Sequence, residues 1–147
     1  MIKKILITIA CLSLLQSNLH ANQSTWNLPK PAQKAPVAIK TIANHYKLVF
    51  FFAGYCGYCH KFAPIVKDIT EEYGFDLTTY SFDGHAIKAL KEPIKANNSH
   101  IEKYFDEVPL ALPLLVAESI KGNRRIILTQ GLTTKENILD QLTQCPI

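Results

Sequence analysis

Cys56 and Cys59 are the residues of this sequence whose type and spacing point most directly to chemistry. They lie in the segment KLVFFFAGYCGYCHKFAP, and His60 follows the second cysteine directly. A C-x-x-C pair is typical of thiol–disulfide exchange, whereas C-x-x-C-H is also the attachment motif of c-type haem. The two thiolates, His60 and a distant residue could also bind zinc. The sequence around the motif has to decide among these three chemistries.

The two cysteines lie between a predicted strand and a predicted helix. Residues 47–53, KLVFFFA, form a continuous apolar run, as expected for a strand that is buried on both faces of a sheet. From Tyr58 to Tyr73, apolar residues recur at helical spacing. Cys56 is therefore expected at the start of a helix, where free backbone N–H groups and the helix dipole favour the thiolate and lower the thiol pKa.

This placement predicts different roles for the two cysteines. Cys56 is expected to attack a partner's disulfide, and Cys59, one helical turn further on, to resolve the mixed disulfide. Gly57 is expected to permit the tight turn, and Tyr58 to form an aromatic wall beside the pair. We interpret His60 mainly as a solvated helix residue that could modulate the thiolate.

Neither alternative chemistry finds all the ligands that it needs. Haem requires a second axial ligand; Met1 is the only methionine and precedes the domain, so His45, His85 or His100 would have to serve. A zinc site lacks a second C-x-x-C or H-x-x-x-H to complete it. We therefore expect no metal and no organic cofactor, and a redox-active Cys56–Cys59 disulfide as the reacting group.

The N-terminus has the layout of a secretory signal peptide. Two lysines precede an apolar run from Ile5 to Leu15, and a polar stretch then ends in Ala21. The run is shorter than the roughly 20 residues that a membrane-spanning helix needs. We expect residues 1–21 to be a signal peptide that is cleaved after Ala21, which places the protein in the periplasm. The alternatives are an uncleaved anchor and a lipid attached to Cys11.

The rest of the chain, from residue 22 on, is long enough for one domain. Residues 22–36 contain three prolines and predict an extended leader, so the domain is expected at 37–147. The whole chain carries a net charge of +4, of which two charges belong to lysines of the signal. Because this excess is small, we expect no nucleic-acid partner.

A third cysteine, Cys145, remains after the signal is removed, and three cysteines cannot form a closed disulfide framework. We expect no catalytic role for it. Asp83 and Gly84 are interpreted as a turn. Asn98 or Ser99 is predicted to cap a short helix.

The order of the predicted elements is that of a thioredoxin-like α/β sandwich, with a central mixed sheet flanked by helices. Gly122 and Asn123 suit the turn of a hairpin between the last two strands. Besides the strand and helix around the cysteines, we predict helices near 37–46, 97–108 and 133–144 and strands near 76–82, 112–119 and 124–131.

The segment FFAGYCGYCHKFAPIVK resembles the active-site segment of thioredoxin-like proteins, including Pro64 where that superfamily has a proline in the helix. LPLLV resembles the segment with the superfamily's cis-proline, which makes Pro113 the candidate and Pro109 a weaker one. The resemblance implies that Pro113 and Leu112 lie beside the cysteines and bind a substrate chain as a short strand. Tyr55 and Tyr58 are predicted to bind substrate too, with Tyr55 packed over the site.

Within this superfamily the chain is similar to the TrbB-type disulfide isomerases of F-type conjugative transfer systems, over residues 45–143. The matching segments are CxYCHxFAP, YSFDG, the proline-strand segment and TQGLTTKENILDQL. The resemblance implies an isomerase or reductase that acts on cysteine-containing exported proteins, such as conjugative pilus or type IV secretion components. A membrane or periplasmic electron donor would keep the pair reduced.

The sequence departs from the superfamily at Phe50, where thioredoxins have a buried acid that helps to deprotonate the resolving thiol. This substitution disfavours a general reductase, and isomerases or oxidants tolerate it better. Two other functions stay open: a periplasmic dithiol oxidase, and a non-catalytic thioredoxin-like module that docks on assembly partners.

Overall fold

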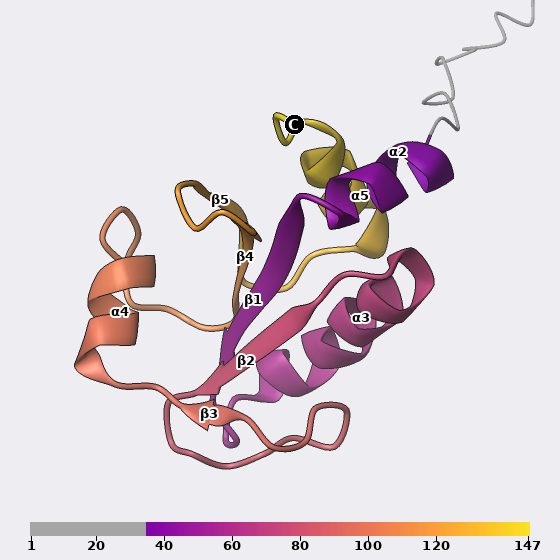
Figure 1. Cartoon of the computed structure of the whole chain (residues 1–147). Coiled ribbons are helices and arrows are strands. Elements are labelled where there is room, and N and C mark those ends of the chain that lie inside the picture. The colour runs from indigo at the N-terminus through magenta and orange to yellow at the C-terminus, as the bar shows by residue number, and fades with distance from the viewer. Residues whose placement is uncertain (1–34) are drawn as a thin grey trace, which may run out of the picture. The chain divides into compact units, whose positions relative to one another are not determined.

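Five strands form one sheet at the centre of the structure, a computed structural model that describes residues 35–147. They are β1 (Tyr46–Phe52), β2 (Leu77–Ser81), β3 (Ile94–Lys95), β4 (Leu114–Ser119) and β5 (Arg125–Gln130). Their order in the sheet is β3-β2-β1-β4-β5 (Figure 1). Strand β1 pairs in parallel with β2 and antiparallel with β4, so the sheet is mixed. The predicted signal peptide lies outside the described residues.

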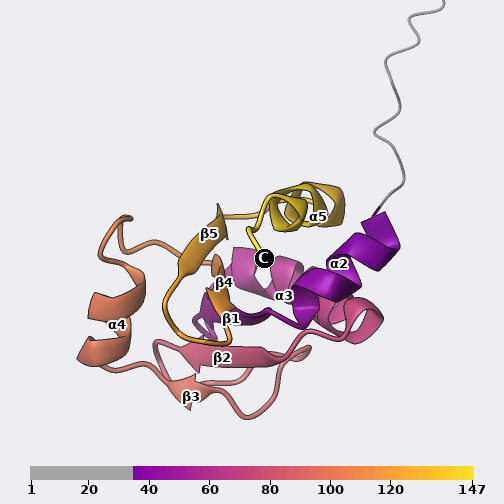
Figure 2. The ribbon, with the colours of Figure 1, turned by 45° about the horizontal axis from the view of Figure 1, so that its top comes forward.

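In the described part of the chain, four helices cover the two faces of this sheet: α2 (Ala35–Ala43), α3 (Gly57–Tyr73), α4 (Asn98–Tyr104) and α5 (Lys135–Thr143). Helices α2, α3 and α5 lie on one face and α4 lies on the other (Figure 2). A parallel β1-α3-β2 unit is followed by α4, by the antiparallel hairpin β4-β5 and by α5. This arrangement confirms the predicted thioredoxin-like fold. Helix α2 begins two residues before the predicted start of the domain.

Strand β1 is buried on both faces because its sequence is apolar at almost every position. Phe50 and Phe52 point into the larger core, where Phe50 packs edge-on against Phe62 of α3. Val49 and Phe51 point into the smaller core below α4. Burying a phenylalanine side chain stabilises a fold by about 1.5–3 kcal/mol. The strand that precedes the cysteines is therefore held firmly from both sides.

One charged side chain, Glu118 of β4, is buried in the α4 face with only 1% of its side chain exposed. The Tyr104 hydroxyl donates to its Oε2 at 2.9 Å, Lys47 Nζ lies 3.1 Å from the same oxygen, and Lys103 pairs with Oε1. Burial opposes ionisation, but the hydrogen bonds from Lys103, Lys47 and Tyr104 hold the pKa of Glu118 below its ordinary value. The carboxylate is thus charged, with Tyr104 and Lys47 beside Oε2 and the ammonium group of Lys103 beside Oε1.

The structure differs from the predicted elements at four places. Tyr46, which was predicted in the helix near 37–46, is the first residue of β1, and α2 ends at Ala43. The edge strand β3 was not expected, because two exposed residues leave no periodic pattern. The predicted cap of α4 is wrong: Asn97 is the N-cap, and its side chain accepts from His100 N at 3.0 Å. Helix α4 also ends at Tyr104, and the next apolar residues, Phe105 and Val108, pack against the smaller core from an irregular segment.

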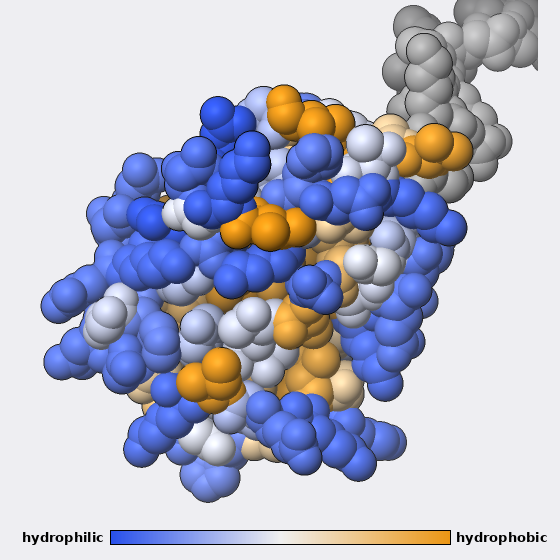
Figure 3. All heavy atoms as spheres, viewed as in Figure 1, coloured by the Kyte–Doolittle hydropathy of each residue, from blue (hydrophilic) through white to orange (hydrophobic). Residues whose placement is uncertain are grey.

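Hydrophilic residues cover most of the face shown in Figure 3, and apolar atoms appear there in separate patches. Between residues 35 and 147, no helix combines the length and the apolar character that crossing a membrane would require.

Candidate active site

Cys56 and Cys59 form a disulfide at the N-terminus of α3, with their Cα atoms 5.2 Å apart. Cys56 is the N-cap residue, and its Sγ accepts a hydrogen bond from Cys59 N at 3.2 Å. The first turn of the helix contains no acidic residue. In the reduced pair, this N–H group and the positive end of the helix dipole favour a thiolate on Cys56.

The two sulfur-bearing residues differ in their access to solvent. Cys56 is partly exposed, whereas Cys59 is completely buried in the larger core. A partner's disulfide can therefore reach Cys56 but not Cys59. This difference fits the predicted roles of attacking and resolving cysteine.

Gly57 does not have the predicted function. Its φ is not positive, and a Cβ atom at this position would meet no atom within 4 Å. Other residues would fit there, so the prediction that Gly57 permits the tight turn is wrong. The glycine that the turn does require is Gly54, where a Cβ would lie only 2.7 Å from Cβ of His85.

Tyr55 and Tyr58 flank the pair at the surface, with 82% and 63% of their area exposed. Tyr55 is thus not packed over the disulfide, which corrects the prediction. The Lys61 ammonium lies 5.9 Å from the centre of the Tyr58 ring. Both rings are free to contact another molecule.

The peptide bond between Leu112 and Pro113 is cis, as predicted, and it is the only cis bond in residues 35–147. Because Phe51 pairs with Leu114, the preceding Pro113 lies level with the end of β1, where the loop to the cysteines begins. Pro113 is buried and Leu112 is half-buried. Strand pairing therefore brings the cis-proline to the same edge of the sheet as the disulfide.

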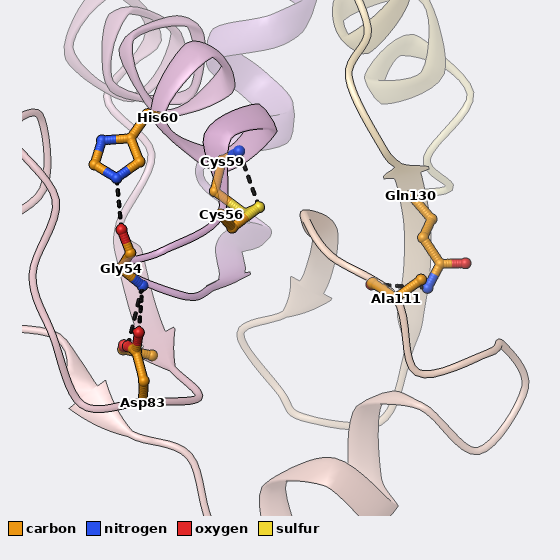
Figure 4. Close-up of a disulfide and its surroundings, with 8 residues drawn as sticks. Gly54, Cys56, Cys59, His60, Asp83, Ala111 and Gln130 are labelled. Atoms are coloured by element: carbon orange, nitrogen blue, oxygen red, sulfur yellow. Dashed lines mark hydrogen bonds between the residues drawn. A yellow bond between two sulfur atoms is a disulfide. The ribbon is translucent and has the colours of Figure 1, made fainter.

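Gln130, at the end of β5, supports the loop before the cis-proline and was not predicted. Its Nε2 donates to the carbonyl of Pro109 at 2.6 Å. It also donates to the carbonyl of Ala111 at 3.1 Å (Figure 4). The next residue, Gly131, donates its N–H to the carbonyl of Pro113 at 2.8 Å. Nothing in the local sequence around Gln130 indicates these contacts.

His60 and Pro64 lie on the exposed side of α3. Together with Lys67 and with Ile87 and Ala89 of the β2–β3 connection, they line an open groove of about 690 Å³. His60 does more than face solvent, because its Nε2 lies 2.7 Å from the carbonyl oxygen of Gly54. The sequence-based interpretation of His60 was therefore incomplete.

Asp83 is the second site residue that the sequence did not reveal. It does begin a turn, with Gly84 at a φ of 78°, but its carboxylate also accepts the N–H of Gly54 at 2.8 and 3.0 Å (Figure 4). Hydrogen bonds from Gly54, Ser81 and His85 hold the pKa of this carboxyl far below its ordinary value. The segment YSFDG contained the residue, but only the fold shows its partner.

The position that carries a buried acid in thioredoxins is occupied by Phe50, which is fully buried and packs against Phe52 and Phe62. Glu118 is the only buried carboxylate in the described part of the chain, and it lies in the other face of the sheet. Within residues 35–147, the core around the Cys59 thiol thus contains no buried carboxylate that could accept its proton.

Cys145 forms no disulfide with either cysteine of the pair. It is a buried free thiol after α5, and burial raises its pKa. Within residues 35–147, His, Cys, Asp and Glu side chains form no group of three that could hold a metal ion.

Comparison with solved structures finds proteins of low sequence identity. They include dsbF of MTB, 15% identical with a TM-score of 0.48, covering 71% of this chain and 83% of that one. A thioredoxin-related protein from Neisseria meningitidis serogroup B is 20% identical with a TM-score of 0.49, covering 76% and 85%. A thiol:disulfide interchange protein from Bacteroides sp. is 14% identical with a TM-score of 0.46, covering 70% and 74%.

Comparison of the sequence agrees with the predicted resemblance. The chain is 31% identical over 88 residues to Protein TrbB of Escherichia coli strain K12, an overlap of 60% of this chain. It matches 49% of TrbB, about half the length of that protein. The model of the TraF family, described as F plasmid transfer operon protein, matches residues 20–143. Because this match spans most of the sequence, the chain belongs to the TraF family.

Proposed function

We propose that this protein is an exported thiol–disulfide oxidoreductase that isomerises or reduces disulfides of secretion or conjugative pilus assembly proteins. The observation that carries the proposal is the Cys56–Cys59 pair at the N-terminus of α3, with one cysteine partly exposed and the other buried. A structural disulfide would gain nothing from an exposed sulfur beside a helix N-terminus. A reactive one needs both features.

The reaction begins with the reduced pair. The Cys56 thiolate attacks one sulfur of a substrate disulfide, so a Cys56–substrate S–S bond forms while the substrate's own S–S bond breaks and releases a thiolate. In isomerisation, a substrate thiolate then attacks the mixed disulfide and regenerates the Cys56 thiolate, with no net transfer of electrons. In reduction, Cys59 loses its proton and attacks the Cys56 sulfur of the mixed disulfide. The Cys56–Cys59 bond forms while the Cys56–substrate bond breaks and releases the second substrate thiolate, so two electrons pass to the substrate.

The surroundings of Cys59 favour the first of these two outcomes. Resolution by Cys59 requires its thiol to lose a proton, and the neighbouring Phe50 offers no acceptor. Slow resolution gives the substrate time to rearrange within the mixed disulfide. This feature supports an isomerase over a general reductase.

Substrate binding is proposed at the surface around the disulfide. The exposed rings of Tyr55 and Tyr58 offer apolar contact, and the segment with Leu112 and Pro113 lies at the same edge of the sheet. An extended substrate chain can add backbone hydrogen bonds to such a segment. The pair itself is the only redox group that this mechanism requires.

The proposed setting follows from the N-terminal sequence and from the family. Residues 1–21 have the pattern of an export signal, which supports a periplasmic location, where disulfides persist. Similarity to TrbB and the description of the TraF family support a role in conjugation. The substrates would then be cysteine-containing exported proteins, and a membrane or periplasmic donor would supply electrons.

Refolding of a scrambled multi-disulfide substrate in glutathione buffer tests the proposal. The wild-type protein should restore substrate activity, and Cys56→Ser should abolish this effect, while Cys145→Ser serves as the matched control and should behave like the wild type. The reduction potential should lie between about −270 mV for thioredoxin and about −120 mV for DsbA. Oxidation of reduced substrates without repair of scrambled ones would instead identify an oxidase. Binding to assembly proteins without either activity would indicate a docking module.

A further inference from the structure

The loop that connects β1 to Cys56 is only three residues long, from Ala53 to Tyr55. Its turn is closed by a hydrogen bond from Cys56 N to Ala53 O at 3.1 Å. A displacement of this loop therefore moves Cys56 directly. The hydrogen bond between Cys59 N and Cys56 Sγ depends on that position, because N–H···S bonds weaken when the sulfur moves out of line.

Asp83 holds this loop from the side of β2. Both of its carboxylate oxygens accept the N–H of Gly54, at 2.8 and 3.0 Å. The carboxylate is itself fixed, since Ser81 Oγ lies 2.7 Å and His85 N 3.0 Å from its Oδ1. Ser81 is completely buried at the end of β2, so this anchor belongs to the sheet.

The other peptide group of Gly54 is held from the side of α3. His60 Nε2 lies 2.7 Å from the carbonyl oxygen of Gly54, and this geometry requires a proton on Nε2. Figure 4 shows Gly54 between the two side chains, with Asp83 on one side and His60 on the other. Close packing completes the arrangement, because a Cβ on Gly54 would lie 2.7 Å from Cβ of His85 and 3.2 Å from Oδ2 of Asp83.

We propose that Asp83 and His60 are positioning residues, which hold Gly54 from both sides and so keep the Cys56 sulfur at the N-terminus of α3. The inference rests on the proposed thiol–disulfide function, because it assigns two residues to the reactivity of the same cysteine. Neither residue needs to touch a substrate. Their effect is to keep the backbone N–H of Cys59 aimed at the sulfur in the reduced pair.

The sign of the expected effect separates positioning from simple electrostatics. If Asp83 acts through its charge alone, its removal would relieve repulsion and make the Cys56 thiolate easier to form. If Asp83 acts through position, its removal loosens the loop, the thiolate loses its N–H partner, and it becomes harder to form. The two explanations therefore predict opposite shifts in the pH dependence of Cys56 reactivity.

The experiment measures the rate of alkylation of Cys56 by iodoacetamide against pH, in a Cys11→Ser, Cys59→Ala, Cys145→Ser background that leaves Cys56 as the single thiol. Asp83→Ala should move the midpoint upward by about 0.5–1 pH unit. Asp83→Asn keeps one acceptor for Gly54 and should move it less. The matched control is Asp76→Ala, which removes the same charge from an exposed position at the other end of β2 and should leave the midpoint unchanged.

His60→Ala provides the second variant, and because His60 is exposed on α3, its removal should leave the fold intact. It should also move the midpoint upward, and circular dichroism checks that each variant is folded. A midpoint that stays within 0.2 unit of the parent in His60→Ala, or that moves downward in folded Asp83→Ala, would overturn the proposal.

This test is separate from that of the proposed function. If the wild-type protein repairs no scrambled substrate but the midpoint still moves upward, the positioning role stands and the isomerase assignment fails. If repair succeeds and the midpoints do not move, the positioning role fails alone.

Discussion

Replacement of Glu118 should measure how much the buried ion cluster below α4 contributes to stability. In Glu118→Ala, the hydroxyl of Tyr104, which is only 4% exposed, loses its partner, and an unpaired buried polar group costs about 1–3 kcal/mol. Loss of the ion pairs with Lys47 and Lys103 adds less to the free-energy cost. The side chains of these lysines are 37% and 42% exposed, so their ammonium groups can turn to water. With the cavity included, we expect a loss of about 3–5 kcal/mol.

Glu118→Gln should cost less, about 1–2 kcal/mol, because the amide oxygen still accepts from Tyr104. Urea unfolding with the disulfide intact, followed by circular dichroism, gives these free energies of unfolding. Glu102→Gln on the exposed surface of α4 is the matched control and should change stability by less than about 0.5 kcal/mol. A loss below about 1 kcal/mol in Glu118→Ala would refute the reasoning.

The difference in free energy of unfolding between the wild type and Glu118→Gln should depend on pH, because the pKa of Glu118 is lowered in the folded state. A carboxyl whose pKa is lower in the folded state stabilises the fold fully above its ordinary value of 4.5, and this contribution is lost as pH falls through the folded value. The stability gap between wild type and Glu118→Gln should therefore be constant near neutral pH and narrow below about pH 4.5. A gap that widens in acid would contradict the assignment of a charged carboxylate.

Three further outcomes are expected. In the reduced protein at neutral pH, alkylation followed by peptide mapping should find Cys56 modified well before Cys59 and Cys145, because the latter two are buried. Earlier labelling of Cys59 would reverse the assigned roles. Gln130→Ala removes the side chain that donates to two backbone carbonyls before the cis-proline. KM for a peptide disulfide should therefore rise several-fold with little change in kcat. An unchanged KM would exclude a role for this loop in binding. Leu142→Ala should lower the free energy of unfolding by about 2–5 kcal/mol, measured in urea, because Leu142 is fully buried; a loss under about 1 kcal/mol would show that α5 packs loosely.

The sequence by itself determined the reactive pair and most of the elements, though not the edge strand β3. The apolar run of β1 and the helical spacing after Tyr58 are local patterns, and they place Cys56 at a helix start whatever the rest of the fold does. The resemblance to thioredoxin-like proteins added Pro113, whose cis bond the structure contains. These features were predictable because each depends on residues that are close together in the chain.

Only the tertiary structure decided what surrounds that pair. Asp83 reaches Gly54 across 29 positions, and Gln130 reaches Ala111 across 19, and both side chains bind backbone groups, which every residue possesses. No side-chain pattern can indicate such partners. The same reason explains the two glycines: Gly57 looked necessary but is open to solvent, whereas Gly54 is required because the turn after β2 packs against its Cα. Contacts with backbone, and the space beside it, exist only once distant segments have come together.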